Sequence, residues 1–271
     1  MIRYFLLLAL GLPSLSGRPI DRAEKDGLSS LLSKAQYEHF FPHHHPLYSY
    51  GAFVKAARGY PEFAGEGDSL VRRRELSAFF AEIAHETGNG GPGSDGGSYT
   101  WGLYYTEEQG CQDGHCKLYN TGGNSPYRPA PGKSYYGRGP IQLTYAYNYG
   151  LAGAELGLPL LAHPELVSQD GVIAFQTALW FWMKGQAPIP SCHAVITGKW
   201  QPDARDIQLG RRPGFGMTIN IINGGVECNT QVPGARRDRE DRIGYYRWFA
   251  GMLQVPVEKD CDCAHMAPYG N

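Results

Sequence analysis

The chain has 271 residues, enough for one large domain or two small ones. Hydrophobic residues make up 42% of it and charged residues 19%, which excludes a disordered or fibrous protein. The formal net charge is −1, so no overall positive field would attract nucleic acid or an anionic membrane, and we expect neither as a partner. The 18 Tyr and 36 Gly residues indicate aromatic faces and long loops, a combination that suits uncharged sugar ligands.

The N-terminus has the layout of a secretory signal peptide. Arg3 precedes the apolar run Tyr4–Leu12, which is too short to span a bilayer, and the small residues Ser14 and Ser16 suit the positions before a cleavage site. We therefore expect residues 1–16 to be a signal peptide and residues 17–271 to be one secreted domain.

Apolar residues at helical spacing predict three helices in the first part of the chain. Two short ones open the domain, and the third begins near Arg72 and ends where Gly88 can cap it. The apolar positions of the three are Leu28, Leu31, Leu32 and Ala35; Tyr50, Phe53, Val54 and Ala57; and Leu76, Phe79, Phe80 and Ile83.

The later part of the chain adds two long helices and few strands. Val172–Met183 is apolar on nearly every side, lies between Asp170 and Gly185, and is expected to be the central buried helix. A last helix is expected from about Asp238 to Leu253, and the best strand pattern is Tyr99–Tyr105. Strands and helices do not alternate, so the sequence predicts one mainly helical domain with long loops.

Six cysteines in an exported chain can all be oxidised, and six cysteines allow fifteen pairings. Cys111 and Cys116 lie in one polar loop that also contains the turn-forming Asp113-Gly114, so we expect them to pair. Of the remaining four, Cys261 and Cys263 cannot easily bond each other without strain, and we expect them to tie the C-terminal tail to the body; the other two are Cys192 and Cys228.

Glu86 is the first candidate catalytic residue. It follows Phe79 by seven positions and Ile83 by three, so on a helix it shares their inward face. Burial and the negative end of the helix dipole both favour the protonated carboxyl, which a general acid requires. Periodicity alone does not distinguish this role from that of a surface Glu in a frayed last turn.

Glu108 is the second candidate, in a polar loop that follows an aromatic stretch. A solvated carboxylate there stays ionised, and two carboxyls in contrasting environments are what glycoside hydrolysis needs. The pair is weak evidence by itself because the chain contains 26 acidic residues, and the neighbouring Glu107 suits the role equally well on composition.

Metal binding is not expected. His85-Glu86 begins like a zinc-protease helix, but Asn89 stands where the second His should be. The cysteines lack zinc-type spacing, and the tract His43-His44-His45 lies between prolines and is better explained as a polar loop.

Beyond these patterns, five ordered motifs resemble those of family 19 chitinases, from about Tyr37 to Cys263. The resemblance implies a lysozyme-like, two-lobed helical domain with a small β-hairpin region, whose cleft cuts β-1,4-linked N-acetylglucosamine polymers with inversion. The motifs are His85-Glu86-Thr87, Trp101-Gly102, Tyr135-Tyr136-Gly137-Arg138-Gly139-Pro140-Ile141-Gln142-Leu143, Tyr147-Asn148-Tyr149-Gly150 and Asn220-Ile221-Ile222-Asn223-Gly224-Gly225.

The same resemblance assigns roles to individual residues. It implies that Glu86 is the general acid, that Glu108 rather than Glu107 is the general base, and that Thr144 replaces a water-holding Ser. It implies no cofactor. It implies further that seven residues bind the sugar chain or support the carboxylates, namely His85, Trp101, Gln142, Tyr147, Asn148, Asn223 and Arg242. Amide side chains suit an N-acetyl group, which presents one donor and one acceptor.

Departures from the family pattern concern the acid loop and the cysteines. Gly88 and Asn89 replace the usual residues after His-Glu-Thr, which loosens the loop beside Glu86. The resemblance implies a Cys228–Cys263 bridge, and elimination then leaves Cys192 to pair with Cys261.

Three functions fit this pattern. We expect a secreted, monomeric, endo-acting chitinase that acts on chitin or chitin oligosaccharides. The alternatives are a peptidoglycan-cleaving enzyme of the same fold and a chitin-binding lectin without catalysis. The lectin is the weakest of the three because Glu86 and Glu108 are both intact.

Overall fold

The computed structural model describes residues 27–112, 116, 119 and 126–269, so the expected signal peptide and the Asp113-Gly114 turn lie outside the described residues. The described chain is mainly helical. Its helices are α1 (Leu28–Leu31), α2 (Lys34–Phe40), η1 (Pro46–Tyr48), α3 (Tyr50–Ala57), α4 (Ser69–Thr87), η2 (Ser98–Thr100), α5 (Ala146–Leu156), α6 (Leu166–Gln169), α7 (Gly171–Met183), α8 (Cys192–Ile196), α9 (Ala204–Gln208), α10 (Phe215–Glu227) and α11 (Ala235–Met252).

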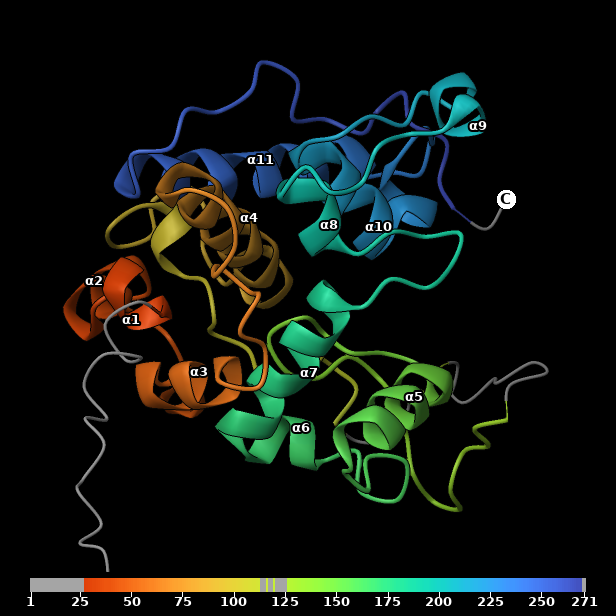
Figure 1. Ribbon diagram of the computed structural model, residues 1–271. Helices are drawn as coiled ribbons and strands as arrows, with labels where there is room; N and C mark the ends of the chain where they lie inside the picture. Colours follow the sequence, from red (N-terminus) through yellow and green to blue (C-terminus); the bar gives the residue numbers. More distant parts are fainter. Residues whose placement is uncertain (1–26, 113–115, 117–118, 120–125, 270–271) are drawn as a thin grey trace, which may run out of the picture.

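The helices form two groups joined through α7. Figure 1 shows α4, α8, α10 and α11 together in one lobe, with α3, α5 and α6 in the other, and α7 running between them. Helix α11 packs along α4, and α3 packs against α7. The two-lobed helical arrangement expected from the resemblance is therefore present.

Helix α4 forms the centre of the core and carries Glu86 in its last turn. The Asp68 side chain caps it by accepting hydrogen bonds from the main-chain NH groups of Leu70 and Val71, both at 2.9 Å. Gly88 ends the helix as expected, with φ −72° rather than a left-handed conformation. The stretch from Glu75 to Ala84 is buried on every side, so α4 is anchored firmly along the residues that precede the candidate acid.

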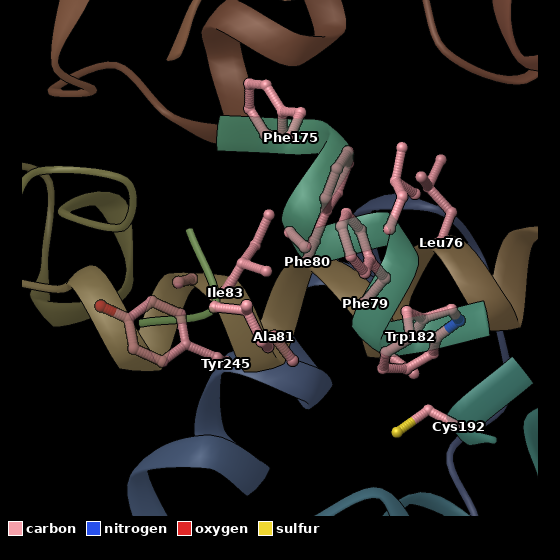
Figure 2. Packing of buried hydrophobic residues seen from close by; sticks show 14 of the residues in the cluster. Leu76, Phe79, Phe80, Ala81, Ile83, Phe175, Trp182, Cys192 and Tyr245 are labelled. Carbon is pink, nitrogen blue, oxygen red and sulfur yellow. The ribbon is translucent and has the colours of Figure 1, made fainter. Parts of the chain in front are cut away.

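Helix α7 is the buried central helix that its apolar sequence predicts. Its N-terminus is capped by Asp170, which accepts from the NH groups of Val172 (2.8 Å) and Ile173 (3.1 Å). Figure 2 shows aromatic side chains of α4 and α7 packed together. The ring centroids of Phe79 and Trp182 are 5.4 Å apart, in an edge-to-face arrangement. This packing joins the two lobes.

Helix α10 was not predicted from the sequence. Asn223 interrupts it with φ −142° and ψ 28°, which lie outside the helical region, and Asn-Gly-Gly at this point is typical of a turn. Helix α11 begins at Ala235, three residues before the predicted start, and ends near the predicted end. The kink in α10 lies beside the candidate site.

The expected strand Tyr99–Tyr105 is wrong, because this stretch begins in the 3-10 helix η2 and continues through turns. The only β pairing among the described residues is three isolated antiparallel bridges. One of them joins Arg138 to Leu143 and constitutes the small hairpin region of the fold. Aromatic content alone produced the strand pattern, and the intervening Gly102 packs against Ala84 of α4 instead.

Two of the three expected disulfides are present. Cys111 bonds Cys116 and Cys228 bonds Cys263, whereas the expected Cys192–Cys261 bridge is wrong and both thiols are free and buried. Cys192 packs into the core at the start of α8, near Trp182 in Figure 2. The Cys261 thiol donates instead to the Glu258 carbonyl at 3.1 Å.

Across the described ranges, no helix is both long enough and apolar enough to traverse a bilayer. Even the most apolar helix, α7, has 13 residues.

Candidate active site

A cleft of about 500 Å³ lies between the two lobes. One wall comes from the ends of α4, α7 and α10, and the other from Glu108, Tyr119, the loop 137–145 and α5. The lining residues are Glu86, Glu108, Tyr119, Gly137, Ile141, Gln142, Leu143, Thr144, Tyr145, Asn148, Phe181, Ile222, Asn223 and Val226. The cleft thus holds both candidate catalytic carboxyls.

Glu86 is held by a buried guanidinium. Its side chain is 18% exposed, and its Oε1 accepts from Nη2 of Arg242 at 2.5 Å. The same guanidinium donates to Glu227 Oε1 at 2.8 Å and to Glu82 Oε2 at 2.7 Å. Glu86 is therefore neither a frayed surface residue nor enclosed by apolar groups, because its partner is a charged side chain from α11.

Glu108 faces the cleft from the opposite wall. Its Oε1 accepts from the Tyr119 hydroxyl at 2.7 Å, and its Oε2 accepts from the main-chain NH of Gly137 at 3.0 Å. Burial and then the hydrogen bond to Glu108 raise the pKa of Tyr119 to about 12, so this phenol stays a neutral donor. The Cys111 and Cys116 sulfurs lie within 4.8 Å of the carboxylate but are bonded to each other, so this group is not a metal site.

The loop that brings donors to Glu108 requires an unusual backbone. Gln142 (φ 49°) and Tyr145 (φ 72°) are non-glycine residues in the left-handed region. A Cβ at Gly137 would lie 2.7 Å from Gln142 Oε1, so a larger residue there would displace the Gln142 side chain beside the NH that reaches Glu108. Strained backbone of this kind concentrates at functional sites.

Thr144 lies in this loop and lines the cleft. Its hydroxyl donates to the Gln142 carbonyl at 2.6 Å, which leaves the hydroxyl lone pairs free to accept from a water molecule. The N-cap of α5 is Tyr145, with no side-chain cap hydrogen bond, so Thr144 does not cap that helix.

Three of the expected sugar-binding amides line the cleft. The Gln142 amide NH2 donates to Gly139 O at 2.9 Å, and the Asn148 amide NH2 donates to Thr144 O at 2.9 Å. The Asn223 amide NH2 donates to Glu227 at 2.8 Å. Each amide is thus fixed through its NH2 group by a protein partner.

The other expected sugar-binding residues do not line this cleft. His85 Nδ1 lies 2.7 Å from Asp241 Oδ2, and the Tyr147 hydroxyl donates to Gln186 Oε1 at 3.4 Å. Trp101 stacks on His43 with ring centroids 4.0 Å apart, and its indole NH donates to the Asp95 carbonyl at 2.9 Å. These contacts organise the segments around the cleft.

Glu107 binds different groups from its neighbour Glu108. Its Oε1 accepts from Nε of the buried Arg138 at 3.2 Å and from the Ser168 hydroxyl at 2.7 Å, and Glu107 does not line the cleft. The two neighbouring carboxylates therefore have different hydrogen-bond partners, a distinction that composition could not make.

The His43-His44-His45 rings take three separate partners. His44 Nε2 lies 2.9 Å from Glu38, and His45 Nδ1 accepts from the Leu47 NH. His43 stacks on Trp101. The rings do not converge on one point.

The structure adds residues that sequence reasoning missed. Glu82 was detectable, since it precedes Glu86 by four positions and shares its helix face. Glu227 lies in the unpredicted helix α10, and Tyr119 is one of 18 Tyr residues in the chain, so no local pattern marked either residue. Their relation to Glu86 and Glu108 depends on long-range contacts.

Comparisons with known proteins identify the family of the chain. The family model described as chitinase class I matches residues 30–263. An acidic endochitinase of Populus trichocarpa is 49% identical over 224 residues, 83% of this chain and 64% of that protein, so this chain spans less than two thirds of its length. An endochitinase of Carica papaya is 42% identical over 90% of this chain and 100% of that protein. The inactive chitinase-like protein 1 of Hevea brasiliensis is 44% identical over 90% and 77%.

Solved structures give the same assignment. Chitinase C from Streptomyces griseus aligns with a TM-score of 0.67 at 33% identity, covering 86% of this chain and 80% of that one. The match to the family model spans most of the chain, and the helical fold agrees with that of the family structures. The chain therefore belongs to the family 19, class I chitinase family of glycoside hydrolases.

Proposed function

We propose that the protein hydrolyses β-1,4-linked N-acetylglucosamine chains, as in chitin and its oligosaccharides, by an endo-acting, inverting single displacement. The observation that carries the proposal is the pair of carboxyls on opposite walls of one cleft, Glu86 beside Arg242 and Glu108 beside Tyr119. An inverting glycosidase needs such a pair, with space between its members for the attacking water and the sugar.

Glu86 is the general acid in this mechanism. It enters the reaction protonated and transfers its proton to the glycosidic oxygen as the bond to the anomeric carbon breaks. The carboxylate that results is stabilised by Arg242 Nη2, 2.5 Å away. A rigid α4 keeps the donor in position.

Glu108 is the general base. It takes one proton from a water molecule as the water oxygen attacks the anomeric carbon from the face opposite the leaving group. The Tyr119 hydroxyl and the Gly137 NH hold the carboxylate in one orientation. Thr144 accepts a hydrogen bond from the same water, so the nucleophile is oriented before it reacts.

Substrate binding uses polar groups on both walls. Gln142, Asn148 and Asn223 present amides toward the cleft, and an N-acetyl group can be recognised by such donors and acceptors. His85, Trp101 and Tyr147 serve the sugar chain from outside this cleft or support its walls. The reaction needs no cofactor.

The proposal includes the cellular context. Residues 1–16 act as a signal peptide, and residues 17–271 form the secreted catalytic domain, which works as a monomer. Mass spectrometry of the secreted protein would identify the cleavage site, and light scattering would give the mass in solution.

Two isosteric variants test the assignment of the carboxyls. Glu86→Gln and Glu108→Gln should each reduce hydrolysis of chitin oligomers by about 100-fold or more, because Gln retains the size but cannot exchange the proton. Glu155→Gln is the matched control: Glu155 of α5 pairs with Lys184 and does not line the cleft, and this variant should keep most activity. Wild-type turnover in either cleft variant would refute the assignment.

The stereochemistry of the product tests the mechanism. Inversion of a β-linkage produces the α-anomer at the new reducing end, and proton NMR early in the reaction distinguishes the two anomers. An initial β-anomer would indicate retention and a covalent intermediate.

The sequence alternatives are tested in parallel. Peptidoglycan shares the β-1,4 N-acetylhexosamine backbone, so a turbidity assay on bacterial cell walls distinguishes that substrate from chitin. A non-catalytic lectin is a relevant alternative because one relative is named an inactive chitinase-like protein. Chitin binding without turnover in the wild-type protein would favour it.

A further inference from the structure

Glu82 is a buried acidic residue that the proposed mechanism does not use. It lies on α4 one turn before Glu86 and is 0% exposed. Its Oε2 is 2.7 Å from Arg242 Nη1, and its Oε1 is 2.7 Å from the Thr218 hydroxyl oxygen. Glu82 therefore joins α4, α10 and α11 directly behind the candidate general acid.

Arg242 contacts more carboxyl groups than its single positive charge can neutralise. One guanidinium contacts three carboxyl groups, those of Glu82, Glu86 and Glu227. Arg239 on the same helix does not neutralise this excess, since its side chain pairs with Asp262 and donates to the main-chain carbonyl of Glu227 rather than to one of the three carboxyls. Whether all three carboxyls were ionised or only Glu82 and Glu227, the cluster would keep uncompensated negative charge in a buried position, which is unfavourable.

The hydrogen bonds of Thr218 identify which carboxyl carries a proton. The Thr218 oxygen lies 2.7 Å from Glu82 Oε1 and 2.7 Å from the Phe215 carbonyl oxygen. A hydroxyl has one proton to donate, and a carbonyl can only accept. If Thr218 donates to Phe215, as Ser and Thr commonly do within helices, the Glu82 carboxyl must donate to Thr218.

Glu227 provides the contrast. Its Oε1 accepts from Asn223 at 2.8 Å and from Arg242 at 2.8 Å, so hydrogen-bond donors satisfy the ionised carboxylate. Burial opposes its charge, but the Arg242 contacts outweigh burial and lower the pKa of Glu227. At Glu82 burial is the dominant effect and raises the pKa despite Arg242.

The remaining groups that face Glu82 favour the same state. From α11 it meets Arg242, from α10 the negative Glu227, and from α8 the thiol of Cys192, whose pKa burial raises well above its usual value. Glu86 follows on the same helix. Arg242 is thus the one cation facing Glu82 in the described part of the chain.

We propose that Glu82 is a positioning residue held as a neutral carboxylic acid, donating its proton to Thr218 and accepting from Nη1 of Arg242. In this state Glu82 aligns the guanidinium so that Nη2 reaches Glu86, without adding a negative charge beside the acid. The catalytic consequence rests on the proposed role of Glu86, whereas the protonation state of Glu82 does not.

Carboxyl NMR tests the protonation state independently of activity. The protein would be labelled with ¹³C at the glutamate side-chain carboxyls, and the Glu82 signal would be identified by its loss in Glu82→Gln. We expect this signal to have the chemical shift of a protonated acid at neutral pH. A carboxylate shift at pH 7 would overturn the proposal, whether or not the protein cleaves chitin.

Kinetics test the positioning role. Glu82→Leu should lower kcat on chitin oligomers roughly tenfold with little change in KM, because Arg242 loses an acceptor and Glu86 is no longer held in place. Glu82→Gln should restore most of that loss, since a neutral amide offers the same acceptor to Arg242. If Leu and Gln reduce kcat equally, the positioning role is wrong.

The pH profile separates this role from simple packing. Were Glu82 ionised, Glu82→Gln would remove a negative neighbour of Glu86, favour the ionised acid, and move the alkaline limb of kcat to lower pH. Because we propose that Glu82 is neutral, we expect the alkaline limb of the kcat profile in Glu82→Gln to stay at the wild-type pH. The matched control is Glu227→Gln, which removes a real charge from the same guanidinium and should move the limb to lower pH. A limb that moves in Glu82→Gln would overturn the proposal.

Failure of the proposed function gives a different result. If Glu86→Gln were as active as the wild type, Glu86 would not be the acid, yet the NMR measurement would still decide the state of Glu82. The two proposals can therefore fail separately.

Discussion

Arg242 shows how one side chain can organise a site built from three helices. It is 1% exposed and donates to carboxyls from α4 and α10 through all three of its nitrogen atoms. Its planar guanidinium presents donors in fixed directions, which the single ammonium of lysine cannot reproduce.

This geometry makes Arg242→Lys a severe substitution. We expect it to lower kcat by about 100-fold and the free energy of unfolding by about 3 kcal/mol, because buried carboxylates lose their donors. Arg236→Lys, at an exposed pair with Glu240 on the same helix, is the control and should be close to neutral. Steady-state kinetics and urea unfolding measure both effects, and wild-type values for Arg242→Lys would contradict the proposed network.

Thr144 permits a separate test of the water-holding role. Thr144→Ser keeps the hydroxyl and should be nearly neutral, whereas Thr144→Ala should lower kcat roughly tenfold with little change in KM. Since Thr144 does not cap α5, neither variant should change Tm greatly. An alanine variant with a lower Tm and normal kcat would show that the hydroxyl acts only in the fold.

At the scale of elements, a buried ion pair joins α4 to α8. Glu75 of α4 is 0% exposed and accepts from the NH of Ala64, the indole NH of Trp182 and Nδ1 of His193. The other ring nitrogen, Nε2, faces Glu66 at 2.9 Å. Burial lowers the pKa of His193, but the bonds and charges of Glu75 and Glu66 outweigh burial and raise it overall.

The raised pKa predicts a pH-dependent stability. A group whose pKa is higher in the folded state stabilises the fold fully below its unfolded pKa, about 6.5 for His, and this stabilisation is lost as the pH rises through the folded value. Wild-type Tm should therefore fall from mildly acidic toward alkaline pH, and His193→Gln should remove this part of the decline. Parallel Tm profiles for the two proteins would rule out the linkage.

The Glu75–His193 pair also determines how much the loss of the His193 side chain should lower the free energy of unfolding. His193→Ala leaves the Glu75 carboxylate buried without a cationic partner, so we expect a loss of about 3 kcal/mol in the free energy of unfolding. His163→Ala is the control, since His163 is 57% exposed beside Glu165 and should change stability little. A loss of similar size in both variants would contradict this view.

At the scale of the whole molecule, the disulfides differ in what they constrain. Cys228–Cys263 closes a sequence separation of 35 and ties the C-terminal segment to the end of α10, whereas Cys111–Cys116 closes a separation of 5. In the chain-entropy model the longer loop contributes about 4 kcal/mol and the shorter about 2 kcal/mol.

Thiol counting and unfolding test this arrangement. The denatured, unreduced protein should react with two equivalents of a thiol reagent, at Cys192 and Cys261. Cys228→Ser/Cys263→Ser should lower Tm more than Cys111→Ser/Cys116→Ser. Zero free thiols, with a peptide linking Cys192 to Cys261, would restore the pairing expected from the sequence.

Local sequence determined the main buried helices, α4 and α7, and the motifs. The apolar spacing around Phe79 and the uniformly apolar run of α7 predicted both helices, because burial of a helix face depends on residues three and four apart. The Cys111–Cys116 bridge was also predictable, since its members are only five positions apart in the sequence. The same periodicity put Glu86 on the inward face of α4 but left open a surface position in a frayed last turn, which the contact with Arg242 excludes.

Tertiary structure decided what those elements do together. No spacing could reveal that Arg242, 156 residues after Glu86, reaches it, or that Tyr119 donates to Glu108. Which cysteines remain free also depended on where α8 and the tail pack. The physical reason is the same in each case: hydrogen bonds, ion pairs and disulfides require atoms to meet in space, and only the packed chain determines which distant residues meet.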